Sequence, residues 1–521
     1  MRYHKNKIKP DSVPVTREIV AQPLSVKLQE NLDDLHLLLE RCSDAVFKEF
    51  TFGSKRENKG LVIFFDGLVD RKEVEVHILK SLMLELNMHS DASYSWPQHD
   101  VLKLIKESVL SMADVKTINT LQDLCHSISS GDTVLLIDGY DTGLAAGTRF
   151  WQGRPVQTPE NEVVVRGPKE GFTETLRFNT ALLRRRIKSP NFKIESFVLG
   201  RITKTDVVLC YIDGIAPEKL VTEVKKRLGM IDIDGILDTG YLEEFLEDNH
   251  WTIFSQMEYS EKPDRVCGHL LEGQVSIMVD GSPIALIAPT SFPRFLIASE
   301  DYYERYIPSS IFRIMRFAAF LVALLLPSLF VAAITYHQEM IPPLLYLTIA
   351  STREGVPFPA FFEALLLEMT FEMLREAGLR LPRSIGPAIS IVGALIIGDA
   401  AVKAGLVSTP MVVIVAFTGI ASFITPSYNA GIMIRLARFG FLIAAGFLGL
   451  FGIVIALLLM LIHMASLNSF GLPYLSPVAP FNLGEMSDII VRRPWFMNTM
   501  RPTMKGMENA VRQKSPTAPE K

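Results

Sequence analysis

The chain has 521 residues, 48% of them hydrophobic, with a mean hydropathy of +0.24 and a formal net charge of −4 at pH 7. This length predicts two or three domains, and this hydropathy excludes a wholly soluble protein. A weakly acidic chain also gives no reason to expect a nucleic acid as a partner.

The first 307 residues predict an α/β region with no stretch that could span a membrane. Apolar runs rich in β-branched residues end in Asp-Gly, which is a strand-to-turn signal because Gly adopts positive φ. Clear copies lie at Asp66-Gly67, Asp138-Gly139, Asp213-Gly214 and Asp280-Gly281, with a weaker copy at Asp234-Gly235. Helical patterns lie between them, at residues 25–42, 99–112, 173–187 and 216–230. Strands that alternate with helices predict two α/β subdomains, residues 1–140 and 141–307.

No arrangement of residues in this region predicts catalysis. The Asp-Gly aspartates could be active-site acids, but no histidine or second carboxylate accompanies them, so the turn role is favoured. The 10 histidines show no metal-ligand spacing, and no GxxxxGK[ST] phosphate loop is present. The widely spaced cysteines predict reduced core residues: Cys42, Cys125, Cys210 and Cys267. We therefore expect no enzymatic activity, no metal and no cofactor.

A run of cations closes one of the helical patterns. Residues 163–190 read VVVRGPKEGFTETLRFNTALLRRRIKSP and end in Arg184, Arg185, Arg186 and Lys188. Such a run could face nucleic acid or lipid headgroups. It is more often the solvated C-terminal end of a helix, where cations complement the helix dipole.

Residues 308–465 predict an all-α polytopic membrane domain of four to six helices, followed by a post-membrane segment and a disordered polar tail, residues 466–521. No charged residue occurs in 317–336, 404–434 or 439–462, and each stretch has at least the roughly 20 residues that a spanning helix needs. Arg313 and Arg316 precede the first stretch, which predicts a cytoplasmic N-terminal region. Five spans would place Arg492 and Arg493 outside, whereas an added interfacial or re-entrant segment would return the C-terminus to the cytoplasm.

A charged helix is predicted within this membrane domain. In residues 361–383, charged side chains lie along one side of the helix while the other sides are apolar. The residues assigned to this charged side are Glu368, Glu372, Arg375 and Glu376. Because charges at membrane depth are costly, this pattern suggests a cavity, a partner helix or an ion path. The alternative is an interfacial helix that keeps its charges in water.

The next segment, residues 385–407, is apolar with small side chains at helical spacing. Such a face permits either close helix packing or a narrow pore. If it lines a pore, the constriction is expected among the apolar side chains Val392, Ile397 and Val402. Asp399 and Lys403 form an i,i+4 pair that would tune ion selectivity or hold the end of the helix.

Several strings together resemble one known family. RGPKEGFTETLRFNTALLRRRIKSP resembles the most recognisable segment of the spore germination receptor A subunits of endospore-forming bacteria, the GerA family. PSSIFRIMRFAAFLVALLLPSLFVAAITYHQEMIP, REGVPFPAFFEALLLEMTFEMLREAGLRLP, IGPAISIVGALIIGDAAVKAGLVS and FGLPYLSPVAPF resemble its later segments. The resemblance runs from about residue 100 to residue 481.

This resemblance implies the A subunit of a nutrient germinant receptor in the spore inner membrane, multi-pass, with a large cytoplasmic N-terminal region. The implied partners are a transporter-like B subunit, a lipoprotein C subunit, membrane lipid, and identical copies that form a ring around a nutrient-gated cation channel. Two alternatives stay open, a related accessory channel subunit of the spore membrane and a transporter.

Overall fold

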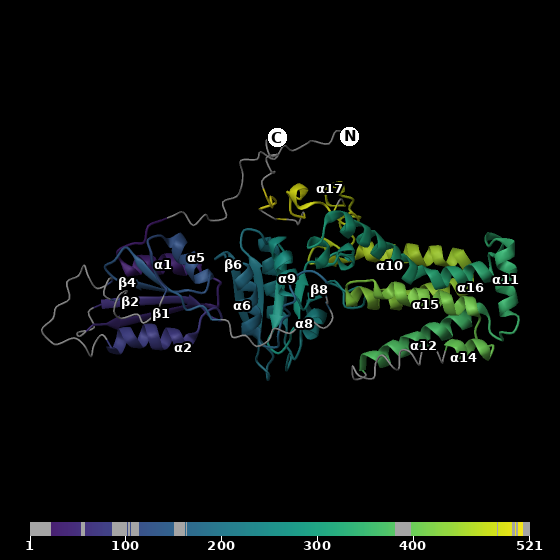
Figure 1. The fold of residues 1–521 in the computed structure, drawn as a ribbon, viewed down its shortest axis with the longest axis horizontal. Helices are drawn as coiled ribbons and strands as arrows, with labels where there is room; N and C mark the ends of the chain where they lie inside the picture. Colours follow the sequence, from purple (N-terminus) through teal and green to yellow (C-terminus); the bar gives the residue numbers. More distant parts are fainter. Residues whose placement is uncertain are drawn as a thin grey trace, which may run out of the picture. The chain divides into compact units, whose positions relative to one another are not determined.

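The computed structural model describes residues 22–53, 58–85, 102, 105, 114–150, 162, 164–380, 398–486, 488–502, 506 and 509–513. The chain folds into two compact units. The α/β unit contains the described parts of 22–247, 259–289 and 495–513, and the helical unit contains those of 248–258 and 290–494. Sheets flanked by helices form the first unit and long helices form the second (Figure 1), so the predicted fold class is confirmed.

The first half of the α/β unit is a sheet between helices. Its elements are α1 (Leu28–Leu38), β1 (Ala45–Phe52), β2 (Asn58–Phe65), α2 (Arg71–Glu73), η1 (Val74–Glu85), β3 (Val115–Ile118), α5 (Leu121–Ser129), β4 (Thr133–Ile137) and β5 (Gly143–Ala146). The strands pair antiparallel in the order β1-β2-β4-β5-β3. Leu61 and Ile63 of β2 pack with α1 and α5, whereas Val62 and Phe64 pack with η1, because successive side chains of a strand point to opposite faces.

The second half repeats the strand order of the first. Its elements are α6 (Leu176–Arg186), β6 (Phe192–Leu199), β7 (Thr205–Ile212), α7 (Glu218–Met230), α8 (Thr239–Leu246), β8 (Glu258–Ser260), α9 (Pro263–Leu271), β9 (Val275–Val279) and β10 (Ala285–Ala288). The sheet order is β6-β7-β9-β10-β8. Equivalent contacts also recur, since Asp138 accepts a hydrogen bond from Leu28 N at 2.9 Å and Asp280 accepts one from Leu176 N at 3.0 Å. The α/β unit is thus an internal duplication.

The clear Asp-Gly turns are confirmed. Each follows a strand, and each glycine has positive φ: Gly67, Gly139, Gly214 and Gly281. The weaker copy, Asp234-Gly235, lies in a loop after α7 instead of at the end of a strand. The cysteines are free and buried, as predicted.

The predicted solvated cation run is wrong for Arg184. This side chain is fully buried and binds Asp44 through Nε at 2.9 Å and Nη2 at 2.8 Å. Its guanidinium stacks on the rings of Phe65 at 4.1 Å and Phe192 at 4.9 Å. Arg184 therefore ties the second half of the α/β unit to the first, and only the later cations of the run reach solvent. The reason is helical register, since Arg184 continues the buried face of α6.

The helical unit contains six helices among its described residues: α10 (Tyr306–Thr335), α11 (Pro343–Arg353), α12 (Ala360–Arg380), α14 (Gly398–Lys403), α15 (Thr409–Phe423) and α16 (Tyr428–Ser466), besides the four-residue α17 (Leu483–Met486). By length and composition, α10 and α16 are able to cross a membrane, and α15 is a shorter apolar helix. The uncharged stretch 404–434 is not one span, because the chain leaves the helix between α15 and α16. Pro426 lies in this break and cannot donate a backbone hydrogen bond.

Helix α16 reverses direction at Gly449, whose φ of 59° and ψ of −140° are not helical. In a straight helix Met433 and Met464 would lie about 45 Å apart. Instead they belong to one apolar cluster and line the same small cavity. Residues 428–448 and 450–466 therefore form two antiparallel helical segments, and the stretch 439–462 is not a single span either.

Short elements surround the start of α10, which we call the near end of the helical unit. They are η3 (Phe292–Leu296), η4 (Ser299–Tyr302), β11 (Asn468–Ser469) and β12 (Leu472–Pro473), while η5 (Gln338–Met340) follows α10 at the opposite, far end. The far end is marked by Tyr336, whose hydroxyl donates to the carbonyl of Gly446 at 2.8 Å.

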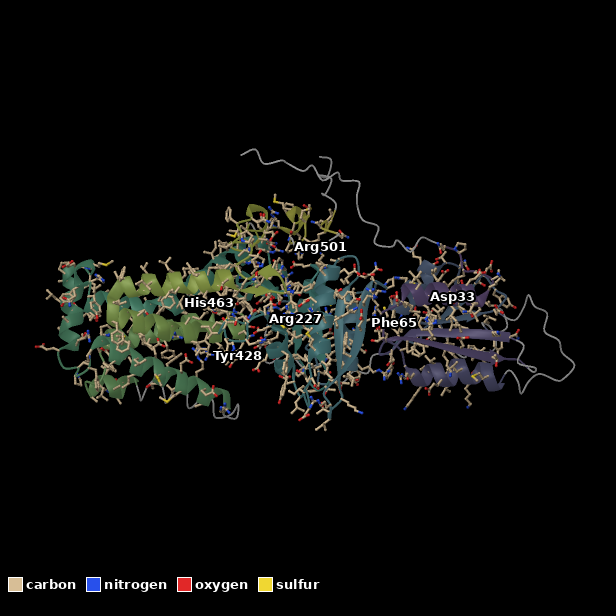
Figure 2. All side chains as sticks on the ribbon, turned by 180° about the vertical axis from the view of Figure 1, so that it is seen from behind. Asp33, Phe65, Arg227, Tyr428, His463 and Arg501 are labelled. Atoms are coloured by element: carbon tan, nitrogen blue, oxygen red, sulfur yellow. The ribbon has the colours of Figure 1, made fainter. Side chains whose placement is uncertain are left out.

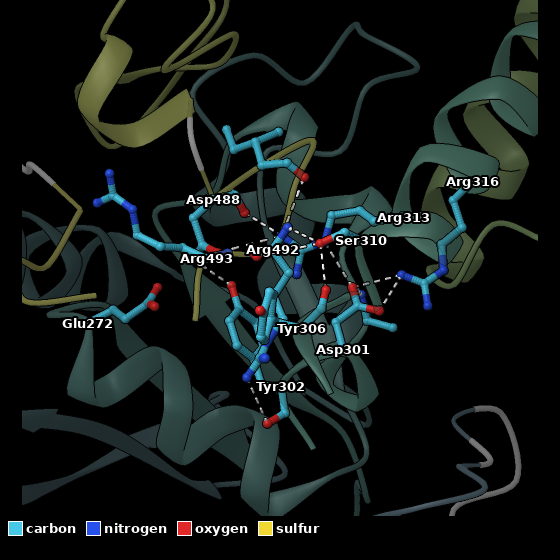
Figure 3. A network of polar contacts seen from close by, with 12 residues as sticks. Glu272, Asp301, Tyr302, Tyr306, Ser310, Arg313, Arg316, Asp488, Arg492 and Arg493 are labelled. Carbon is cyan, nitrogen blue, oxygen red and sulfur yellow. Dashed lines mark hydrogen bonds and ion pairs between the residues drawn. The ribbon is translucent and has the colours of Figure 1, made fainter. Parts of the chain in front are cut away.

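The chain after α16 returns to the near end. Arg313 of α10 is fully buried, binds Asp301 at 3.1 Å and donates to the carbonyl of Asp488 (Figure 3). Ser310 of α10 accepts a hydrogen bond from Arg492 N at 3.1 Å. In the α/β unit, η7 (Trp495–Met497) and the described tail residues follow, and Arg512 pairs with Glu272 at 2.7 Å, where the sequence predicted disorder.

Candidate functional site

From Glu363 to Arg375, helix α12 carries its charges inward and several large apolar side chains outward. Its sequence, AFFEALLLEMTFEMLREAGLR, is rich in strong helix formers. Phe362, Leu366, Met369 and Met373 recur at spacings of four and three and are exposed. Glu368 is 1% exposed and lies on the opposite side. A water-soluble helix has the reverse arrangement, so α12 fits an apolar surrounding.

The buried carboxylates of α12 pair with arginines of α16. Glu368 Oε2 lies 2.6 Å from Arg438 Nη1, and both side chains are 1% exposed. One turn further along α12, Glu372 Oε2 lies 3.0 Å from Arg435 Nη1, and Glu372 Oε1 lies 3.6 Å from Arg438 Nη2. Two carboxylates one turn apart thus meet two arginines one turn apart, which joins the two helices through matched faces.

Arg375 extends these contacts to α15. Its Nη2 donates to Ser422 Oγ at 2.7 Å, and its Nη1 lies 3.7 Å from Glu372 Oε1. The guanidinium lies over the rings of Phe371 at 4.9 Å and Phe423 at 4.6 Å. We call Glu368, Glu372, Arg375, Arg435 and Arg438 the charge cluster. It connects α12, α15 and the first segment of α16.

The charge cluster contains one more arginine than carboxylate. A surplus positive charge repels cations, and both carboxylates are already engaged by guanidinium groups. Among the described residues, Glu368 Oε1 and Arg438 Nε have no hydrogen-bond partner, so the cluster is not fully satisfied. The arrangement therefore suits an ionic connection between helices better than a cation path.

Another buried carboxylate lies in the first turn of α12. Glu363 is fully buried and accepts hydrogen bonds from Ser408 N, at 2.5 Å, and from Ser408 Oγ. Ser408 is the N-cap residue of α15, so the carboxylate lies where the helix dipole favours negative charge. Arg353 of α11 lies 3.5 Å from Glu363 Oε2. Glu363 thus joins α11, α12 and α15.

The predicted site residues fall into separate groups. Glu368, Glu372 and Arg375 come together, and their geometry is that of the partner-helix alternative. Glu376 is outside this group and pairs with Arg380 at 2.7 Å on the surface.

The candidate pore residues lie on or before α14. Asp399 and Lys403 form an exposed ion pair at 2.6 Å. Val402 is half-buried and packs with an apolar cluster that includes Val407 and Met411. Val392 and Ile397 lie outside the described residues.

Arg435, Arg438 and Glu363 are the residues that sequence reasoning missed. The sequence does contain a signal for the two arginines. Two arginines three residues apart between apolar stretches need buried partners. The neighbouring acidic helix offers carboxylates at matching spacing. Among the described residues, no group of His, Cys, Asp and Glu could hold a metal ion.

Comparison with known proteins gives consistent results. A family model described as "Bacillus/Clostridium GerA spore germination protein" matches residues 33–504. The chain is 44% identical over 481 residues to "Uncharacterized membrane protein YfkQ" of Bacillus subtilis (strain 168), which covers 92% of each protein. It is 42% identical over 497 residues to "Spore germination protein KA" of the same organism, covering 95% of this chain and 90% of the relative.

A solved structure is also similar. It is the crystal structure of the N-terminal domain of the A subunit of the Bacillus megaterium spore germinant receptor GerK3, which is 36% identical in sequence. The match covers 52% of this chain and 98% of that chain, with a TM-score of 0.42.

Proposed function

This chain belongs to the Bacillus/Clostridium GerA spore germination protein family, and we propose that it is the A subunit of a nutrient germinant receptor in the spore inner membrane. The observation that carries this proposal is the match over residues 33–504, together with a spore germination protein 42% identical over 95% of the chain. The proposed location is supported by α10, which is long and apolar enough to cross a membrane, and by a relative named as a membrane protein.

We further propose that identical subunits assemble into a ring that encloses a cation channel, with a transporter-like B subunit and a lipoprotein C subunit as partners. One chain offers few helices with which to enclose a pore, and cyclic assembly of copies is the common solution. The role is not enzymatic. A purified protein that stays monomeric both in mild detergent and in lipid discs would contradict the ring.

In this proposal the segment 385–407 lines the pore, and Val392, Ile397 and Val402 form its apolar constriction. Asp399 and Lys403 hold the end of this segment or tune selectivity. Helices α12 and α15 run in the same direction, since Glu363 meets the start of α15 and Arg375 meets its end. The end of α12 and the start of α15 therefore lie at opposite ends of this helix pair, which supports the proposal that the segment crosses the membrane.

Gene deletion in the spore-forming host tests the receptor role. Spores that lack a receptor subunit lose the response to its nutrients and keep the response to others, as measured by potassium release after each nutrient is added. An accessory channel subunit would instead slow the response to every nutrient. The same deletion is also made in a strain in which the other family members are already deleted. Normal release with all nutrients in that strain would exclude both roles.

The proposed gate is tested at Val402. Replacing Val402 with Ala wets and widens an apolar constriction, which favours the open state, and about 1.4 kcal/mol shifts that equilibrium tenfold. We expect potassium release without nutrient at unchanged protein abundance. Val412→Ala is the matched control, because Val412 of α15 packs with the same apolar cluster as Val402. Reduced abundance with normal dormancy in both variants would assign Val402 to packing alone.

A further inference from the structure

The loop of residues 248–256 leaves the α/β unit between α8 and β8 and belongs to the helical unit. Its base is closed by Gln256, which is fully buried. Gln256 Oε1 accepts from Asn249 N at 3.1 Å, and its Nε2 donates to Asn249 O at 2.8 Å. Trp251 N in turn donates to Asn249 Oδ1 at 3.0 Å. These hydrogen bonds join the two ends of the loop.

This loop is attached to both ends of α16. Thr252 Oγ1 lies 2.9 Å from His463 Nε2, in the last turns of the helix. Asn429, in the first turn, donates to Ser255 Oγ at 3.3 Å. Because α16 reverses at Gly449, its first and last turns lie at the same end of the helical unit, where Figure 2 shows Tyr428 and His463.

Phe254 shows how far along α10 the loop reaches. Phe254 is buried and lines the same small apolar cavity as Phe320 and Leu324 of α10. These residues follow Arg316, the last charged residue of α10. The loop thus reaches the level at which α10 has already become uncharged, which is where a spanning helix enters the hydrocarbon layer.

Two apolar side chains of the loop point away from the protein. Trp251 is 97% exposed and Ile253 is 45% exposed. They flank Thr252, which contacts His463, and the exposed side chains Leu459 and Ile462 lie within one turn of His463 on α16. Exposed apolar side chains therefore occur both on the loop and on the turn of α16 to which the loop is attached.

We infer that this loop is a membrane-interface anchor, in which Trp251 and Ile253 insert among the lipid headgroups and upper acyl chains beside the end of α16. Tryptophan suits this position because its ring is apolar and its indole N–H bonds to headgroups or water. Tyr428, the first residue of α16, is half exposed at the same end and provides a second such ring. The anchor would attach the connection between α8 and β8 to the leaflet surface.

Lipid quenching of tryptophan fluorescence tests the anchor and rests on the proposed membrane location of the helices. The full chain carries four tryptophans, so a variant with Trp96, Trp151 and Trp495 changed to Phe leaves Trp251 as the only emitter. It is placed in lipid discs whose acyl chains carry bromine either close to the headgroup or close to the chain end. We expect blue-shifted emission and stronger quenching by the shallow bromine.

Two control variants, each with all native tryptophans changed to Phe, separate the possible failures. Leu459→Trp reports the lipid-facing side of α16, and Val198→Trp reports an exposed position of the α/β unit that is 62% exposed in the structure. If Leu459→Trp is quenched while Trp251 behaves like Val198→Trp, the anchor is wrong and the membrane location stands. If Trp251 emission is blue-shifted but no bromine quenches it, protein and not lipid covers the loop, and the anchor is equally wrong. If neither Leu459→Trp nor Trp251 is quenched, the membrane location itself fails.

Discussion

Individual buried charges join α12 to the first segment of α16. Glu368 and Arg438 are each 1% exposed, so removing one partner leaves the other as an uncompensated charge. Such a loss is typically worth about 3–5 kcal/mol, whereas the net contribution of the intact pair can be near zero. The pair therefore specifies which faces of α12 and α16 meet more than it adds to stability.

We predict that Glu368→Gln destabilises the protein by about 3 kcal/mol or more. The measurement is thermal unfolding of the purified full chain in detergent. Glu376→Gln is the matched control on the same helix, because Glu376 is exposed and its surface ion pair contributes about 0–1 kcal/mol. The double variant Glu368→Gln/Arg438→Met should recover part of the loss. Equal melting of Glu368→Gln and Glu376→Gln would contradict the role of the charge cluster.

The cysteines of the α/β unit are free and buried. Desolvation raises the pKa of the Cys125 thiol and of the Cys267 thiol from 9.0 to about 12. A raised pKa means that the folded state holds the proton more tightly, so the stability from these thiols is present below pH 9 and is lost as the pH rises toward 12. At pH 8 the thiolate fraction is about 1,000-fold below that of a free cysteine.

We therefore predict that native protein resists alkylation at pH 8, and that urea-unfolded protein is modified at all cysteines. Iodoacetamide labelling followed by mass spectrometry measures both rates for Cys125 and Cys267. A native labelling rate within tenfold of the unfolded rate would show that these thiols reach solvent.

At the scale of the elements, the reversal of α16 depends on a single residue, Gly449. At φ 59° and ψ −140°, Gly449 occupies a region that side chains rarely adopt. A Cβ at this position would also lie 3.0 Å from the side chain of Tyr336. The reversal that brings both segments of α16 against α10 thus requires glycine.

Gly449→Ala should destabilise the protein by about 1–3 kcal/mol from backbone strain, and by more if Tyr336 cannot move. Gly440→Ala is the control, because Gly440 lies in the same helix with no atom within 4 Å of the added Cβ, and alanine favours helix over glycine by about 1 kcal/mol. Thermal unfolding in detergent compares the two. Gly449→Ala with unchanged or higher stability would exclude the reversal.

At the scale of the whole molecule, contacts within the helical unit bear on the proposed membrane topology. The start of α10 binds the chain after α16, through Asp488 to Arg313 and Arg492 to Ser310. The end of α10 meets the reversal of α16 through Tyr336. The chain therefore crosses between these ends an even number of times. In the proposed membrane location, Arg492 and Arg493 would then lie on the same side as Arg313 and Arg316, in agreement with the positive-inside rule.

We predict that the N-terminal region and the C-terminus lie on the same, cytoplasmic side. Fusions at the C-terminus of the full chain measure this in a bacterial host. A fluorescent protein that folds only in the cytoplasm should be bright, and alkaline phosphatase, which is active only outside, should be inactive. Active phosphatase would support an odd number of crossings and would contradict the contacts between Arg313 and the residues around Asp488.

By itself the sequence determined the α/β class of the N-terminal region, the Asp-Gly turns, the helical membrane-type region and the family, because turn residues, periodicity and family strings are local signals. Only the tertiary structure decided that Arg184 is buried against Asp44, that Arg438 pairs with Glu368, and that α16 reverses at Gly449. Each of these joins residues distant along the chain or depends on one backbone conformation. The same local pattern, a cation at a helix end or a glycine in an apolar run, is compatible with either outcome until the packing partner is in place.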